Sequence, residues 1–272
     1  MEKKAPTENK MGIMPIPKLI LNMSLPMIVS MLVQALYNIV DSFFVAKISE
    51  QSLTAVSLAF PAQNLMIGAA TGTAVGVNAL LSRALGEKNQ RLANDIAEHG
   101  VFLALVGYLV FLMFGLFGAR AFFAAQTSVD EIIGFGVDYL SVICCFSFGV
   151  FGQIMFERLM QSTGRTIYTM FTQGLGAIIN IILDPVFIFV FHQGVKGAAI
   201  ATVIGQIVAF LLAVYLNHTK NADVQLNLRE FRPKGRIIGR IYAIGVPSII
   251  MFCAGNARDT AVSARRSYRA TK

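Results

Sequence analysis

Charged residues are scarce in this sequence. They make up 14% of its 272 residues, whereas a soluble domain of this size normally carries about a quarter. Hydrophobic residues reach 55% and the mean hydropathy is +0.63. So few charges leave too little polar surface to keep a globule in water, which excludes a soluble protein. The composition predicts an integral membrane protein whose main partner is the lipid bilayer.

Cysteine and histidine are also rare. Cys144 and Cys145 are adjacent in an apolar stretch and Cys253 stands alone, which gives neither a disulfide framework nor metal-ligand spacing. The three histidines are scattered over helix ends and loops. The chain shows no nucleophile–base pair, no intramembrane His/Glu set and no phosphate-binding loop. We therefore expect no enzyme and no cofactor.

The net charge of +8 would suit a nucleic-acid partner, but the distribution of the basic residues argues against one. They lie in short gaps between apolar stretches, and no basic face is interleaved with aromatic residues. We expect no nucleic-acid binding.

Six apolar stretches are long enough to cross a bilayer, which takes about 20 residues. They predict an all-α membrane protein with a bundle of six transmembrane helices at residues 18–46, 53–82, 99–120, 132–157, 166–191 and 197–217. Residues 241–257 predict the start of a seventh helix. A cytoplasmic N-terminal segment (1–17), a basic linker (218–240) and a polar, basic tail (258–272) complete the predicted organisation. We expect no cleaved signal peptide.

The distribution of Lys and Arg predicts the orientation in the membrane. With the N-terminus inside, the outer segments hold only Lys47, Arg120 and Lys196. The inner segments hold fifteen basic residues: Lys3, Lys4, Lys10, Lys18, Arg83, Lys88, Arg91, Arg158, Arg165, Lys220, Arg229, Arg232, Lys234, Arg236 and Arg240. We therefore expect a multi-pass protein of the cell (inner or plasma) membrane with a cytoplasmic N-terminus and linker.

A short repeat suggests that this chain is half of a larger protein. Residues 245–250 (GVPSII) echo residues 24–29 (SLPMIV), and both follow a basic residue. Parallel repeats of this kind build two-lobed transporters. After Gly255 the sequence becomes small, polar and basic, as in a truncated or out-of-frame product. We therefore expect a missing C-terminal lobe, or a homodimer partner in its place.

We place three carboxylates within the spans: Asp41, Asp138 and Asp184. A charged Asp at mid-bilayer costs about 2.5–3.5 kcal/mol on insertion scales, so such residues are functional candidates. Asp138 lies near a helix end, where solvation is the simpler explanation. Asp41 shares one helix face with Gln34, Tyr37 and Asn38, at i, i+3, i+4 and i+7 spacing. This polar stripe must face protein or water, either in a functional cavity or in a helix–helix contact.

Asp184 has a similar setting, with Asn180 one turn earlier and Pro185 directly after it. Proline frees backbone carbonyls of the preceding turn. Carboxylate, amide and carbonyl oxygens suit a hard cation such as Na⁺, and a desolvated Asp can instead carry a proton. Thr202 and Gln206, one turn apart, offer further oxygens or ordinary packing.

Two other features concern the shape of the helices. Pro26 predicts a kink in the first helix, either a hinge between two states or a static bend. Small residues between Gly68 and Gly76 predict close helix packing.

Taken together, these residues give the sequence a family resemblance. Pro26 followed by Gln34-x-x-Tyr37-Asn38-x-x-Asp41 resembles the first helix of the multidrug and toxic compound extrusion (MATE) transporters. Residues 82–88 (SRALGEK) are similar to the inner loop after the family's second helix. The most specific match is Asn180-x-x-x-Asp184-Pro185 followed by residues 194–202 (GVKGAAIAT). The resemblance covers about residues 15–252.

The resemblance implies a twelve-helix, two-lobed antiporter that exports bulky, often cationic small organic compounds against Na⁺ or H⁺. It implies a coupling-cation site at Asp41, Asn180, Asp184 and Thr202 in the N-terminal lobe, and no metal beyond Na⁺. Two departures stand out. Arg165 occupies a loop position where many relatives carry an acidic residue, and the second lobe is missing.

Two alternatives to an active antiporter remain. A flippase for lipid-linked precursors, with a related fold, would favour a strongly cationic cavity, yet we find no intramembrane Lys or Arg. The second alternative is that the chain is an inactive truncated product.

Overall fold

The computed structural model describes residues 14–227 and 231–270 of the chain, with residues 256–270 as backbone only. The described residues form helices and no strand, which confirms the predicted all-α fold. The elements, with η for π-helical turns, are α2 (Ile16–Ala46), α3 (Glu50–Gly86), α4 (Gln90–Met113), η1 (Phe114–Gly118), α5 (Ala119–Ala124), α6 (Asp130–Cys145), α7 (Phe148–Ser162), α8 (Thr166–Pro185), η2 (Val186–Val190), α9 (Gly194–Lys220) and α10 (Gly235–Ala270).

These elements form the six predicted spans and the start of a seventh. Four spans are α2, α3, α8 with η2, and α9. A fifth is the continuous rod α4–η1–α5, and the sixth is α6 with α7, which are bent by 45° at their junction. The apolar part of α10, Gly235–Gly255, is long enough to be the seventh.

The helices extend beyond the predicted spans because polar capping residues, and not the edges of the apolar runs, set their ends. The Ser49 hydroxyl accepts a hydrogen bond from the Ser52 backbone N–H (3.0 Å) at the start of α3. The Asn89 carboxamide does the same for Leu92 (3.1 Å) at the start of α4. Such caps satisfy the otherwise unpaired first-turn donors.

The boundaries predicted around the seventh helix are wrong. α9 continues to Lys220 and α10 begins at Gly235, directly after Pro233-Lys234, so the connection is residues 221–234 instead of 218–240. α10 also runs past residue 257 to Ala270. Residues 256–270 contain neither Gly nor Pro and several Ala and Arg, and this composition supports a helix even where it is polar.

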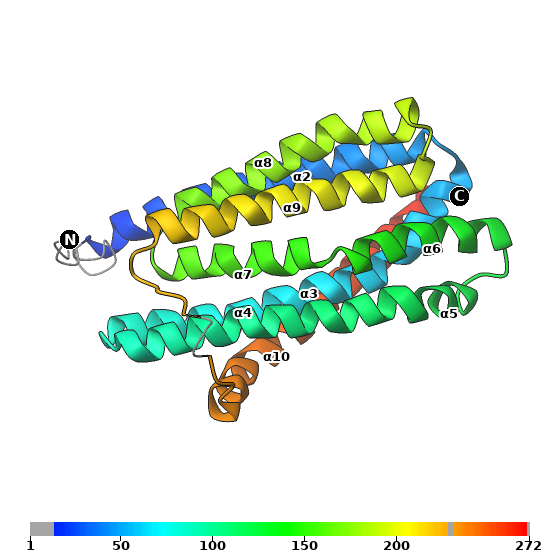
Figure 1. Cartoon of the computed structure of the whole chain (residues 1–272). Coiled ribbons are helices and arrows are strands. Elements are labelled where there is room, and N and C mark those ends of the chain that lie inside the picture. The colour runs from blue at the N-terminus through cyan, green and yellow to red at the C-terminus, as the bar shows by residue number, and fades with distance from the viewer. Residues whose placement is uncertain (1–13, 228–230, 271–272) are drawn as a thin grey trace.

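The helices are arranged in two groups joined by α7. Figure 1 shows α2, α8 and α9 gathered on one side of the bundle, α3 and α4 on the other, and α7 between them. α6 packs against α3 and α9. We call the end of the bundle at which α3 ends and α4 begins the linker end, because the connection 221–234 also lies there.

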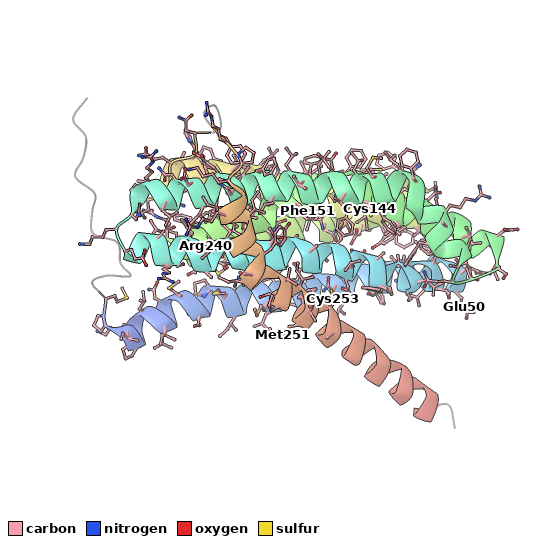
Figure 2. All side chains as sticks on the ribbon, turned by 90° about the horizontal axis from the view of Figure 1, so that it is seen from below. Glu50, Cys144, Phe151, Arg240, Met251 and Cys253 are labelled. Atoms are coloured by element: carbon pink, nitrogen blue, oxygen red, sulfur yellow. The ribbon has the colours of Figure 1, made fainter. Side chains whose placement is uncertain are left out.

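α10 crosses the bundle in close contact with α3. A Cβ atom on Gly72 would lie 2.9 Å from the Gly245 carbonyl oxygen, and one on Gly76 would collide with the Ile241 carbonyl oxygen. The predicted role of this small-residue stretch in close helix packing is therefore confirmed. Figure 2 shows α10 leaving the bundle beyond Cys253, so its last turns project from the packed helices.

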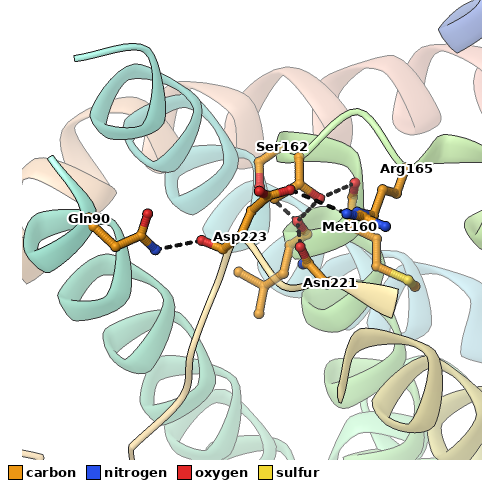
Figure 3. A network of polar contacts seen from close by, with 8 residues as sticks. Gln90, Met160, Ser162, Arg165, Asn221 and Asp223 are labelled. Carbon is orange, nitrogen blue, oxygen red and sulfur yellow. Dashed lines mark hydrogen bonds and ion pairs between the residues drawn. The ribbon is translucent and has the colours of Figure 1, made fainter. Parts of the chain in front are cut away.

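Side chains hold the described parts of the connection, residues 221–227 and 231–234, against the linker end. Arg165, which departs from the acidic pattern noted above, pairs with Asp223 (Nη2–Oδ2 3.5 Å), while Gln90 of α4 donates to the Asp223 backbone oxygen at 2.6 Å (Figure 3). Further along, the buried His99 ring accepts from the Lys234 backbone N–H at 2.8 Å. The Lys234 ammonium pairs with Asp95.

Candidate cation site and the adjoining cavity

A hydrogen-bond network joins α8 to α9 near the end opposite the linker. Asn180 donates from its amide nitrogen to Asp184 Oδ2 at 2.8 Å. Its amide oxygen accepts from both the hydroxyl and the backbone N–H of Thr202, each at 3.0 Å. All three side chains are at least 97% buried. Asn180 and Asp184 meet because four residues make about one helical turn.

The same network reaches α2 through Tyr37. Its hydroxyl lies 3.4 Å from Thr202 Oγ1. Because the Thr202 hydroxyl donates to Asn180, the Tyr37 hydroxyl is the donor in this contact. The consecutive helices α8 and α9 therefore meet the distant helix α2 at one cluster of polar side chains.

Asp41 completes this cluster, which we call the Asp41–Asp184 site. It lies one turn after Tyr37 on α2, close enough to Asp184 for the two charges to interact. Asp41 Oδ1 and Asp184 Oδ1 are both buried, and neither has a hydrogen-bond partner among the described residues. A buried carboxylate oxygen without a partner is costly. The residues of this site therefore favour a bound cation or a proton.

The backbone beside Asp184 is irregular. α8 ends at Pro185 and continues as the π-helical turn η2. Proline has no N–H to donate, so the regular ladder of backbone hydrogen bonds is interrupted there. π-Helical turns within α-helices often occur at functional sites.

A cavity of about 570 Å³ adjoins the site. Tyr37, Asn180 and Thr202 line both, so they form the wall between the cavity and the two aspartates. The volume lies in the range of small-molecule pockets. Amide side chains are unusually frequent on its surface: Gln34, Asn38, Gln63, Asn64, Gln153, Gln161, Gln173 and Gln206.

The remaining predicted residues divide between the cavity and more distant places. Gln34 and Asn38 line the cavity and bond weakly to each other, at 3.4 Å. Pro26 is buried on α2 about 22 Å along the helix axis from Asp41, and α2 is continuous through it. Asp138 is exposed on α6, apart from the site.

Glu157 is a fourth carboxylate in the spans, and the sequence analysis missed it. It is the last residue of the predicted span 132–157. A charged residue at the edge of a span is normally interpreted as a solvated helix end. In the structure α7 continues to Ser162, so Glu157 is 3% exposed and lines the cavity. Its neighbour Arg158 also lines the cavity, which corrects the expectation of no intramembrane Lys or Arg. Gln153 and Gln161 lie one turn on either side of Glu157, and this polar stripe was the sequence signal that could have indicated a buried, cavity-lining carboxylate.

The oxygen-only donor set of the Asp41–Asp184 site fits a hard, weakly polarising cation. The site offers carboxylate and hydroxyl oxygens, while the Asn180 amide turns its nitrogen to Asp184. Among the described residues, no group of three His, Cys, Asp or Glu is placed to hold a transition metal. The same two carboxylates fit a proton equally well. Oxygen groups of this kind are those that Na⁺ and H⁺ prefer.

Comparison with known proteins decides the family. The sequence profile of the MatE family matches residues 26–186. This chain belongs to the MATE family. The multidrug export protein MepA of Staphylococcus aureus is 28% identical to it over 248 residues, which are 87% of this chain and 53% of MepA. The resemblance on which the sequence analysis rested is thereby confirmed.

Solved structures agree. A MOP superfamily transporter from Pyrococcus furiosus matches this MATE chain with a TM-score of 0.85 at 28% identity, covering 92% of this chain and 56% of that one. An outward-facing multidrug resistance MATE family transporter matches with a TM-score of 0.82 at 30% identity, covering 86% and 52%. The chain thus spans about half the length of the relatives it matches. Its family is one of membrane transporters.

Proposed function

We propose that this MATE chain forms the N-terminal lobe of an antiporter that exports organic, often cationic compounds in exchange for Na⁺ or H⁺. The observation that carries the proposal is the pair Asp41 and Asp184, buried beside a cavity, with one oxygen of each left without a partner. Two neighbouring carboxylates in a low-dielectric site repel each other until a cation or proton joins them. Cation binding is therefore coupled to how closely α2 approaches α8.

α2 is suited to move in response. It lies at the edge of the bundle and packs mainly against α8: only 6% of its most apolar stretch is buried, against 50% of that of α3. Pro26 would let the helix bend, because the residue removes a backbone hydrogen bond from its middle. Binding at Asp41 draws α2 toward α8, reshapes the adjoining cavity and releases the organic compound outward.

The charge distribution supports placing the chain in the cell membrane with the linker end in the cytoplasm. The basic residues gather at that end, as the rule for inner loops requires. The cavity does not favour the lipid-precursor flippase, because Arg158 is its only basic lining residue among the described ones and Glu157 lies beside it. An anionic lipid headgroup would need a more cationic surface.

Efflux measurements test the proposal. Ethidium extrusion is followed in drug-sensitive cells that produce the complete transporter, with Asp41→Asn introduced. We expect efflux to fall to background while the protein still inserts, because one of the two carboxylates no longer takes up the cation. Asp138→Asn is the matched control and should transport normally, since Asp138 is exposed on another helix. Normal efflux by Asp41→Asn would refute the proposal.

A further inference from the structure

Glu157 is held in a preorganised setting that the Asp41–Asp184 site does not use. Its carboxylate accepts three hydrogen bonds: from Thr172 Oγ1 (2.7 Å), from Gln153 Nε2 (3.0 Å) and from Gln173 Nε2 (2.8 Å). The donors come from α7 and α8, so the group is fixed between two helices. All three donors are neutral.

The adjacent Arg158 is close enough for its charge to interact with this carboxylate, but the two form no ion pair. Arg158 turns its guanidinium to Gln161 Oε1 at 2.8 Å, and no ion pair of the described residues includes Glu157. A buried carboxylate that forms no ion pair still carries a desolvation cost. A glutamine would keep the packing and most of the hydrogen bonds without that cost, so stability does not explain the carboxylate.

The surroundings of Glu157 suit an organic cation. Its side chain lines the cavity of about 570 Å³, where the amides of Gln153 and Gln173 donate to the carboxylate and Arg158 lies beside it, bonded to Gln161. Apolar side chains complete the lining, among them Met31, Phe60, Ile154 and Phe252. A carboxylate next to an apolar and aromatic wall offers one partner for a positive charge and another for a hydrophobic body.

Glu157 is well separated from the Asp41–Asp184 site. Its partner Thr172 lies twelve residues before Asp184 on α8, which is about 18 Å along the helix axis. The two acidic sites thus lie toward opposite ends of one cavity. Asn180 and Thr202 form the cavity wall on the side of the aspartates.

We propose that Glu157 binds the positively charged group of the exported compound, at a site distinct from the one for the coupling ion. This proposal rests on the proposed export of organic cations. The chain then carries one carboxylate site for each of the two exchanged species. Both can be occupied at once, and communication between them runs along α8 and through the cavity.

Binding to the purified chain tests this assignment. The probe is radiolabelled tetraphenylphosphonium, a permanent organic cation, measured by scintillation proximity in detergent at fixed pH without Na⁺. We expect Glu157→Gln to weaken its binding at least about tenfold, the loss of one charge–charge contact. Glu131→Gln, an exposed glutamate on α6, should leave the affinity unchanged within about twofold.

Two further variants separate a lost charge from a damaged fold. Glu157→Asp keeps the charge and should retain more affinity than Glu157→Gln. The neutral compound triphenylphosphine oxide should compete with the label for the same cavity. Its affinity should be equal in Glu131→Gln and in Glu157→Gln, because it carries no charge for Glu157 to bind. No binding by the unsubstituted chain, or equal tetraphenylphosphonium affinity in Glu157→Gln, would overturn the proposal.

The outcome is separable from that of the proposed function. Asp41→Asn should keep its affinity for tetraphenylphosphonium under these Na⁺-free conditions within about threefold, although it abolishes coupled efflux. A Glu157→Gln variant with unchanged binding would refute the substrate site alone. Normal efflux by Asp41→Asn would refute the coupling site and leave the Glu157 result standing.

Discussion

Tyr37 of α2 and Thr202 of α9 bring their side-chain oxygens to 3.4 Å, although 165 residues separate them in the chain. Among the described residues, this contact is the one hydrogen bond that ties α2 to another spanning helix. Because α2 is so little buried, a polar contact at this point strongly affects where the helix lies. Tyr37 lies one helical turn from Asp41, so this contact links the position of α2 to the cation site.

Tyr37→Phe should therefore loosen α2 without disturbing the apolar packing. Loss of one hydrogen bond costs about 1 kcal/mol, which lowers the thermal midpoint by roughly 2–4 °C for a chain of this size. Circular dichroism in detergent measures the midpoint. Tyr215→Phe is the control, because Tyr215 is 63% exposed on α9 and its removal should shift the midpoint by less than about 1 °C. Equal shifts would argue against the contact.

Thr202→Val keeps the shape of the side chain and deletes its hydroxyl. Asn180 then loses a donor and Tyr37 its acceptor, so the amide that holds Asp184 is less well oriented. We expect the affinity for the coupling cation to fall about tenfold, measured by ²²Na⁺ binding or by proton uptake. Thr219→Val, at an exposed position whose hydroxyl donates to the Tyr215 carbonyl of its own helix, should change nothing. An unaltered affinity in Thr202→Val would exclude Thr202 from the site.

The close contact of α3 and α10 offers a covalent test. A Cβ atom on Gly68 would lie 3.1 Å from Cys253 Sγ, and about 3 Å separates these atoms in a disulfide. Gly68→Cys should therefore cross-link to the native Cys253 under mild oxidation, as detected by mass spectrometry after proteolysis. Gly134→Cys, which has no neighbour within 4 Å, should stay reduced. Failure of the first cross-link would contradict the packing of α10.

Glu157 should reduce stability in return for its function. The buried carboxylate forms no ion pair among the described residues, so Glu157→Gln removes a desolvation cost. We expect the thermal midpoint to rise by about 2 °C or more at neutral pH, with Glu131→Gln unchanged. A clear fall in the midpoint would instead assign Glu157 a structural role.

The sequence predicted the spans because an apolar run of about 20 residues has few alternatives to a membrane helix. Spacing along one helix was equally informative. It placed Tyr37 and Asp41 on one face of α2, and Asn180 one turn from Asp184. The relation between helices was not readable in this way: that Thr202 meets both Tyr37 and Asn180 depends on tertiary packing.

Glu157 shows what the hydropathy pattern could not predict. Hydropathy places the edge of a span where the first charge occurs, and it cannot tell a solvated end from a buried carboxylate with three donors. Two of those donors, Thr172 and Gln173, come from the next helix. Only the bend between α6 and α7 and the continuation of α7 to Ser162 carry Glu157 into the cavity wall.

Cation binding to the purified chain tests the central claim most directly. Titration with ²²Na⁺, together with pH-electrode measurement of proton uptake, should show one saturable site in the unsubstituted chain. Asp41→Asn and Asp184→Asn should each abolish that site, because neither remaining carboxylate can hold the cation alone, whereas Asp138→Asn should retain it. Saturable binding that survives both Asp41→Asn and Asp184→Asn would contradict the account.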